Sequence, residues 1–249
     1  MQSSIAKLGA LFEKDARDML KNPTMLVTVV LPVAMIVLYR FVYRDLLAAA
    51  EADLAVRLAS DGLFLCSALC LSVGMVGSMT LVYGIAEEKE KHTLRTLMLA
   101  NVSAGQVALA KGLVCLAMTL LVGTLCFALT GVSWNAFPAF IGLTALGSVP
   151  VILLGLVLGL ASRDQMTAGL SSMPILLLCL VPMFAPMAPE AEAVATFTPL
   201  GGVVELMRLV LAGELTLEAA ALPLAVTAAW TLLGAVVFKL LYRKLAQDN

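Results

Sequence analysis

Long apolar segments alternate with short polar ones along the whole chain. Six of the apolar segments approach the roughly 20 residues that a helix needs to cross the hydrocarbon core of a bilayer. They predict membrane spans over 24–43, 62–85, 112–131, 138–161, 167–187 and 219–241. The pattern therefore predicts an all-α polytopic membrane protein with a single transmembrane domain over 1–249.

Two polar stretches precede the second span. In 3–21, apolar residues recur at helical spacing while lysines and carboxylates fill the remaining face. This pattern predicts an interfacial helix that lies along the membrane surface. Residues 44–61 are rich in charge and are expected to form a polar connection between the first two spans.

The segment 195–213 is apolar but too short to span. Thr198 is a candidate N-cap, and Pro199 then occupies the first helical position. Glu205 and Arg208 stand three residues apart, and a glycine follows at 213. We expect a re-entrant or surface-lying helix on the outer side, and a surface helix without function is the alternative.

The densest run of charge in the chain lies between the second and third spans. A charge at the bilayer centre costs about 3 kcal/mol even on lenient insertion scales, so this run belongs at a membrane surface. An apolar stripe at helical spacing within it predicts a short amphipathic helix over 87–100. The residues of this helix that carry charge or apolar contacts are Glu87, Glu88, Lys89, Glu90, Lys91, His92, Leu94, Arg95, Leu97 and Met98.

Composition agrees with a membrane protein, because 61% of the residues are hydrophobic and 13% are charged. Soluble domains are nearer a quarter charged. With the amino terminus inside, twelve of the sixteen lysine and arginine residues fall on the cytoplasmic side. This positive-inside bias predicts that both termini and the charged run are cytoplasmic. No basic tract suggests nucleic acid, and the net charge is −1.

The chemistry of an enzyme is not evident in the sequence. The nearest approach to a phosphate loop, ending at Lys111, lacks the second glycine and the following hydroxyl residue. The single histidine, His92, has no visible nucleophile partner. The five cysteines lie in apolar segments without nearby histidine or carboxylate, so we interpret them as core-filling thiols rather than metal ligands. Span interiors also lack the ionisable residues of an ion-coupled carrier.

The charged run followed by Lys111 resembles the corresponding region of the membrane subunits of type-2 ATP-binding-cassette (ABC) exporters. In that family a carboxylate-rich motif after the second span begins a coupling helix that contacts the ATPase, and Glu88 and Glu90 match it. The run Phe197-Thr-Pro-Leu200 is similar to the outer helices before the sixth span. The resemblance covers the whole chain in order.

The resemblance implies a permease that is not itself an enzyme. It binds no cofactor, while ATP and Mg²⁺ are held by two copies of a separate ATPase subunit. It also implies a homodimer in the inner or plasma membrane of a prokaryote. Residues 87–100 would couple to the ATPase: Glu87, Glu88, Glu90 and Arg95 through charge, and the apolar stripe through packing. A merely solvated charged loop is the alternative.

The substrate is expected to be hydrophobic or amphipathic, a peptide first and a lipid or drug next. The spans that form the path in this family offer adaptable methionines and few fixed polar groups. The candidate path residues are Met35, Met75, Met79, Met173 and Met183. A cytochrome-assembly-type permease, an ion-coupled carrier and a membrane scaffold without transport activity remain the alternative functions.

Overall fold

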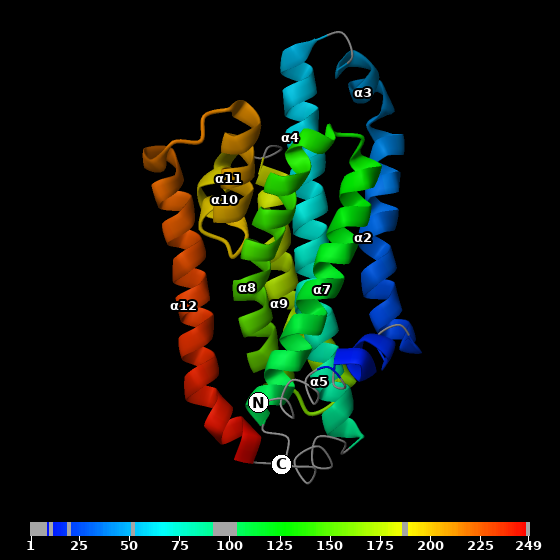
Figure 1. Ribbon diagram of the computed structural model, residues 1–249, viewed down its shortest axis with the longest axis vertical. Coiled ribbons are helices and arrows are strands. Elements are labelled where there is room, and N and C mark those ends of the chain that lie inside the picture. The colour runs from blue at the N-terminus through cyan, green and yellow to red at the C-terminus, as the bar shows by residue number, and fades with distance from the viewer. Residues whose placement is uncertain are drawn as a thin grey trace.

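The computed structural model describes residues 9, 12–18, 21–50, 53–91, 104–185 and 189–247, and all regular elements among them are helices (Figure 1). Six of the helices are long and apolar enough to cross a membrane. The predicted all-α polytopic fold with six spans is therefore confirmed.

The helices follow one another with short connections. Their bounds are α2 Pro23–Val42, α3 Arg44–Ala50, α4 Leu54–Leu71, the π-helix η1 Ser72–Thr80, α5 Leu81–Glu90, α7 Ala104–Thr130, the 3₁₀ turn η2 Trp134–Ala136, α8 Phe137–Ala161, α9 Gln165–Phe184, α10 Pro189–Thr196, α11 Gly201–Ala212 and α12 Leu217–Gln247.

The connection predicted over 44–61 is mostly helical instead. It consists of α3 and the first turns of α4, which rise above the neighbouring helices in Figure 1. Asp53 supplies the N-cap of α4, since its carboxylate accepts a hydrogen bond of 2.8 Å from the backbone N–H of Ala55. A capped helix can continue beyond the apolar stretch, so hydropathy alone placed the start of this span too late.

One continuous helical rod, formed by α4, η1 and α5, runs through the centre of the bundle. Of the residues in its most apolar 18-residue segment, 89% are buried inside the molecule. In η1 the hydroxyls of Ser72 and Ser78 donate to carbonyls of the same helix, those of Ala68 and Gly74. Stretches of π-helix are often found at functional sites. The pattern of apolar residues did not predict this π-helix.

The α5 part of the rod packs closely against small residues of α8. Gly155 and Gly159 lie four residues apart and face Leu81 and Ile85, and a Cβ on Gly159 would come within 2.9 Å of the Ile85 side chain. Small residues at this spacing allow the two helices to approach closely.

A similar close contact between α5 and α9 gives a testable prediction. A Cβ at Gly169 would lie 2.6 Å from the Tyr83 hydroxyl, so we expect Gly169→Ala to lower the free energy of unfolding by about 1–2 kcal/mol. Tyr83→Phe removes the obstructing oxygen. Unfolding in mixed micelles should show that Gly169→Ala hardly changes the free energy of unfolding in the Tyr83→Phe background. An equal loss of stability in both backgrounds would contradict this contact.

Different elements gather at the two ends of the bundle. Residues 12–18, the C-terminal end of α5, the starts of α7 and α9 and the end of α12 gather at one end, which we call the α5 end (Figure 1). The elements α3, α10 and α11 lie toward the other, the α3 end. Of the interfacial helix predicted over 3–21, residues 9, 12–18 and 21 are described, and they are helical.

Candidate functional site

The charged run begins inside the central rod. Glu87 to Glu90 form the last turn of α5, and Lys91 follows as its C-cap. The predicted separate helix over 87–100 therefore starts as a continuation of the second span. Its other predicted residues, His92, Leu94, Arg95, Leu97 and Met98, lie outside the described residues.

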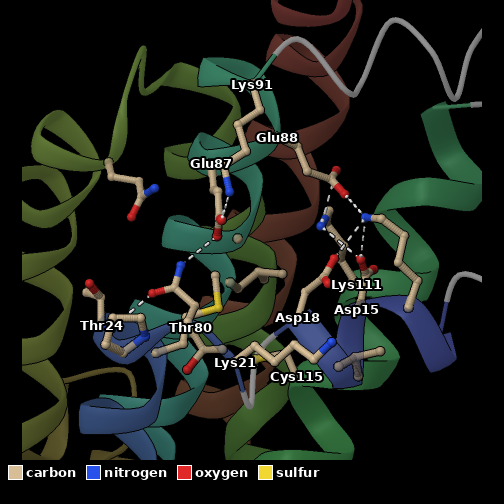
Figure 2. A pocket seen from close by; sticks show the side chains of 18 residues that line it. Asp15, Asp18, Lys21, Thr24, Thr80, Glu87, Glu88, Lys91, Lys111 and Cys115 are labelled. Carbon is tan, nitrogen blue, oxygen red and sulfur yellow. Dashed lines mark hydrogen bonds and ion pairs between the residues drawn. The ribbon is translucent and has the colours of Figure 1, made fainter.

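Glu88 turns into the protein toward a small group of charges. Its carboxylate pairs with Lys14 at 2.6 Å and with Lys111 at 3.2 Å, and Lys111 in turn lies 3.4 Å from Asp15 (Figure 2). Glu88 and Lys111 are almost completely buried, with side chains only 8% and 7% exposed. We call Lys14, Asp15, Glu88 and Lys111 the four-charge cluster. It joins the interfacial helix, α5 and α7.

The neighbouring carboxylate, Glu87, contacts the start of the first span. Asn22 donates its side-chain N–H to Glu87 over 2.7 Å, and Lys91 pairs with the same carboxylate from one turn later. Glu87 and Lys91 stand at i,i+4, a spacing at which opposite charges on a helix attract each other. Because Asn22 also caps α2 through its contact with the Thr24 N–H, Glu87 holds the entry of α2 in place.

Lys89 and Glu90 reach the turn between α8 and α9. The Lys89 ammonium donates to the carbonyl of Leu160 over 2.7 Å, close to the C-terminal end of α8. Glu90 accepts a hydrogen bond of 3.3 Å from the backbone N–H of Gln165, the first residue of α9. Both contacts are electrostatically favourable, because cations are stabilised at helix C-termini and anions at helix N-termini.

Ion pairing stabilises the charged forms of two lysines of this region, Lys14 and Lys91. Burial alone would lower the pKa of the Lys14 ammonium, but its hydrogen bond and attraction to Glu88, with the charges of Asp15 and Asp18, outweigh this and raise the pKa. The hydrogen bond with Glu87 raises the pKa of Lys91. Paired ions of this kind are suited to holding helices together rather than to relaying protons.

The end of α5 is thus a point at which several elements are joined. Four consecutive residues connect it to the interfacial helix, α2, α7, α8 and α9. Within the described residues no group of three histidine, cysteine or acidic side chains could hold a metal ion. Sequence reasoning identified Glu87 to Lys91 but missed Lys14 and Asp15 as their partners. Lys111 was the residue that could have pointed to these partners, because a lysine at the edge of an apolar segment needs a counter-ion.

At the α3 end, α10 and α11 form a short helical hairpin. Its second helix packs against α4, α8, α9 and α12 (Figure 1). Whether this helix is re-entrant or lies on the outer surface stays a prediction. Arg208 pairs with Glu205 at 3.4 Å, as predicted, and also with Glu192 at 3.5 Å. Gly213 ends α11 in the left-handed conformation, with φ of 71°.

The predicted start of the outer helix is wrong. The N-cap of α11 is Leu200, and Thr198 and Pro199 lie in the turn before it. The Thr198 hydroxyl donates backwards to the carbonyl of Ala195 over 2.7 Å, and the N–H of Gly201 at the start of α11 donates to the backbone carbonyl of Thr198 over 3.1 Å rather than to its side chain. The preceding helix α10, which the sequence pattern did not separate from α11, uses this hydroxyl instead.

The candidate path methionines occupy different environments. Met75 and Met183 are buried in the core of the single chain, whereas Met173 is 48% exposed on α9. Met35 and Met79 are partly buried against the same core. The five thioethers therefore do not share one exposed face, and their role in a substrate path stays a prediction.

Comparison with known proteins identifies a family. A family model described as ABC-2 family transporter protein matches residues 59–241, which extend from α4 to α12. No curated protein matches the chain. The match includes the end of α5, Lys111 and the α10–α11 hairpin.

Proposed function

The chain belongs to the ABC-2 transporter family, and from this premise we propose that it exports a hydrophobic or amphipathic substrate from the cytoplasm. It is an ABC transporter permease with several membrane-crossing helices. Permeases of this family generally pair with an ABC ATPase subunit. The proposal concerns the direction, the substrate and the way in which this permease uses its partner.

The energy would come from two copies of a separate ATPase subunit, which bind ATP and Mg²⁺, while this chain binds neither. A second copy of the chain would complete the membrane path as a homodimer. The α5 end would face the cytoplasm of a prokaryote from its inner or plasma membrane. The excess of lysine and arginine at that end supports this orientation.

The observation that carries the proposal is the set of connections at the end of α5. Glu88, Lys89 and Glu90 attach it to α7, α8 and α9, and it continues without a break into the most buried helix of the bundle. A force applied just beyond Lys91 would therefore reach the core of the permease directly. We assign the contact with the ATPase to residues 92–98 and the exposed Glu90. Glu87, Glu88, Lys89 and Lys91 would connect this contact to the rest of the bundle.

The surface of the chain supports an apolar or amphipathic substrate. Apolar side chains are exposed along α9, with Leu170 at 71% and Leu177 at 62%. Between them lies Met173, whose flexible thioether adapts to varied apolar partners. A peptide is the first candidate, and a lipid or drug the second.

The test is transport in proteoliposomes that contain the permease and its ATPase with ATP on the ATPase side. We expect a fluorescent amphipathic peptide to accumulate in the lumen with ATP and not with a non-hydrolysable analogue. A labelled polysaccharide of similar mass serves as the matched probe and should stay outside. Preferential uptake of the sugar chain would contradict the substrate class, and uptake driven by an ion gradient without ATPase would contradict the mechanism.

A further inference from the structure

A cavity of about 560 Å³ lies at the α5 end, between the interfacial helix and the helices α2, α5 and α7 (Figure 2). Its volume falls within the roughly 300–1,000 Å³ range of small-molecule sites. Glu87, Glu88 and Lys111, which hold the end of α5 in place, also line this cavity. A ligand bound there would therefore contact the joined end of α5.

The walls of the cavity combine two kinds of surface. Met25, Leu81, Val114 and Cys115 form an apolar part. Charged side chains from the interfacial helix, α5 and α7 form the polar part. A ligand that matches both parts is an amphiphile, with a charged headgroup and an apolar portion.

The accessible charge on the polar wall is mainly positive. The carboxylates of Asp15 and Glu88 are only 10% and 8% exposed and are already paired with lysines. In contrast, the side chain of Lys91 is 63% exposed and that of Lys14 is 40% exposed. Asp18, at 57%, is the accessible acid among these wall residues.

Lys21 is the cation best placed for a ligand. It is exposed, it lines the cavity, and within the part of the chain that the structure describes it makes no ion pair (Figure 2). Lys91 uses one carboxylate, Glu87, although an ammonium has three donors. Both lysines can therefore donate to an anion without giving up a contact of the fold.

We propose that this cavity binds the anionic headgroup of a phospholipid from the leaflet at the α5 end, through Lys21 and Lys91. The acyl chains would leave past Pro23 and Thr24, exposed residues of the cavity wall, and follow the exposed apolar face of α2, where Val27 is 59% and Val30 is 53% exposed. A bound headgroup would bridge the interfacial helix to the end of α5. The inference rests on the proposed membrane orientation and not on the direction or substrate of transport.

Native mass spectrometry of the purified full chain tests the proposal, with phosphatidylglycerol and phosphatidylcholine as probes. Loss of one charge-assisted hydrogen bond corresponds to about a tenfold loss of affinity. We expect Lys21→Gln to weaken phosphatidylglycerol binding by about that factor and to leave phosphatidylcholine binding unchanged. Lys91→Gln, on the opposite wall, should have a smaller effect of the same kind.

Arg17→Gln is the matched control. Arg17 lies on the same helix, is 64% exposed and pairs with Glu13, and it does not line the cavity. Its loss removes the same charge from the membrane surface but should leave phosphatidylglycerol binding intact. Equal losses in Arg17→Gln and Lys21→Gln would overturn the site in favour of general surface attraction.

A soluble competitor separates the lipid from a free phosphate ester. Glycerol 3-phosphate should not displace phosphatidylglycerol, because it lacks acyl chains that could contact the exposed apolar face of α2. Displacement at comparable concentration would overturn the lipid assignment. Since no ATPase or transport is measured, failure here leaves the proposed function standing, and failure of transport leaves this site standing.

Discussion

Lys111→Met is expected to lower the free energy of unfolding by about 3 kcal/mol, the order observed when one partner of a buried ion pair is removed. Without this ammonium, the nearly buried carboxylates of Asp15 and Glu88 share only Lys14, which is also close to Asp18. The expected loss is large because the negative charges stay buried without full compensation. Denaturant unfolding in mixed micelles measures it.

A double-mutant cycle separates this pairing from loss of side-chain packing. In a Glu88→Gln background, where one of the two carboxylates is neutral, Lys111→Met should cost at least about 1 kcal/mol less than in the natural chain. Lys239→Met is the control, since Lys239 is exposed on α12, and it should change stability by no more than about 0.5 kcal/mol. Additive effects of the Glu88 and Lys111 substitutions would contradict the four-charge cluster.

Gly201→Ala is expected to have the second large effect, because the turn between α10 and α11 has no room for a side chain. A Cβ at Gly201 would lie 2.0 Å from the carbonyl oxygen of Ala195 and 2.5 Å from that of Thr196. Since both are backbone atoms, the turn itself must open. We expect a loss of about 3 kcal/mol, at the upper end of the usual cost of overpacking.

Gly142→Ala provides the comparison for this prediction. Gly142 lies in α8, and a Cβ added there would meet no heavy atom within 4 Å, so alanine should be tolerated. Unfolding measurements on the two variants should therefore differ by about 3 kcal/mol. Similar stabilities would show that the α10–α11 turn is looser than its contacts indicate.

The sequence predicted the spans because a bilayer imposes one simple requirement. A helix that crosses hydrocarbon must be apolar over about 20 residues, and this signal is local. The ends of helices depend on caps and on neighbouring elements, which are less local. Thr198 shows the difference, since its hydroxyl could cap the following helix by pattern but contacts the preceding one in the structure.

The candidate site was predictable in position but not in contacts. The density of charge marks Glu87 to Lys91 as a surface feature, and the resemblance to exporters gives it a role. Which charge each residue meets depends on where the interfacial helix, α7 and the α8–α9 turn come together. Glu88 and Lys111 are 23 positions apart in the chain, and no periodicity relates them.

The central claim is that an ATPase subunit acts on this permease beyond the end of α5, and co-purification tests it most directly. The tagged chain is isolated from its own host in mild detergent and its complex is measured by intact mass and ATP hydrolysis. The account predicts a stoichiometric ATPase subunit that is lost with Arg95→Glu and retained with Arg57→Glu, a matched charge reversal at the α3 end. Isolation of the folded chain alone, without ATP hydrolysis, would contradict it.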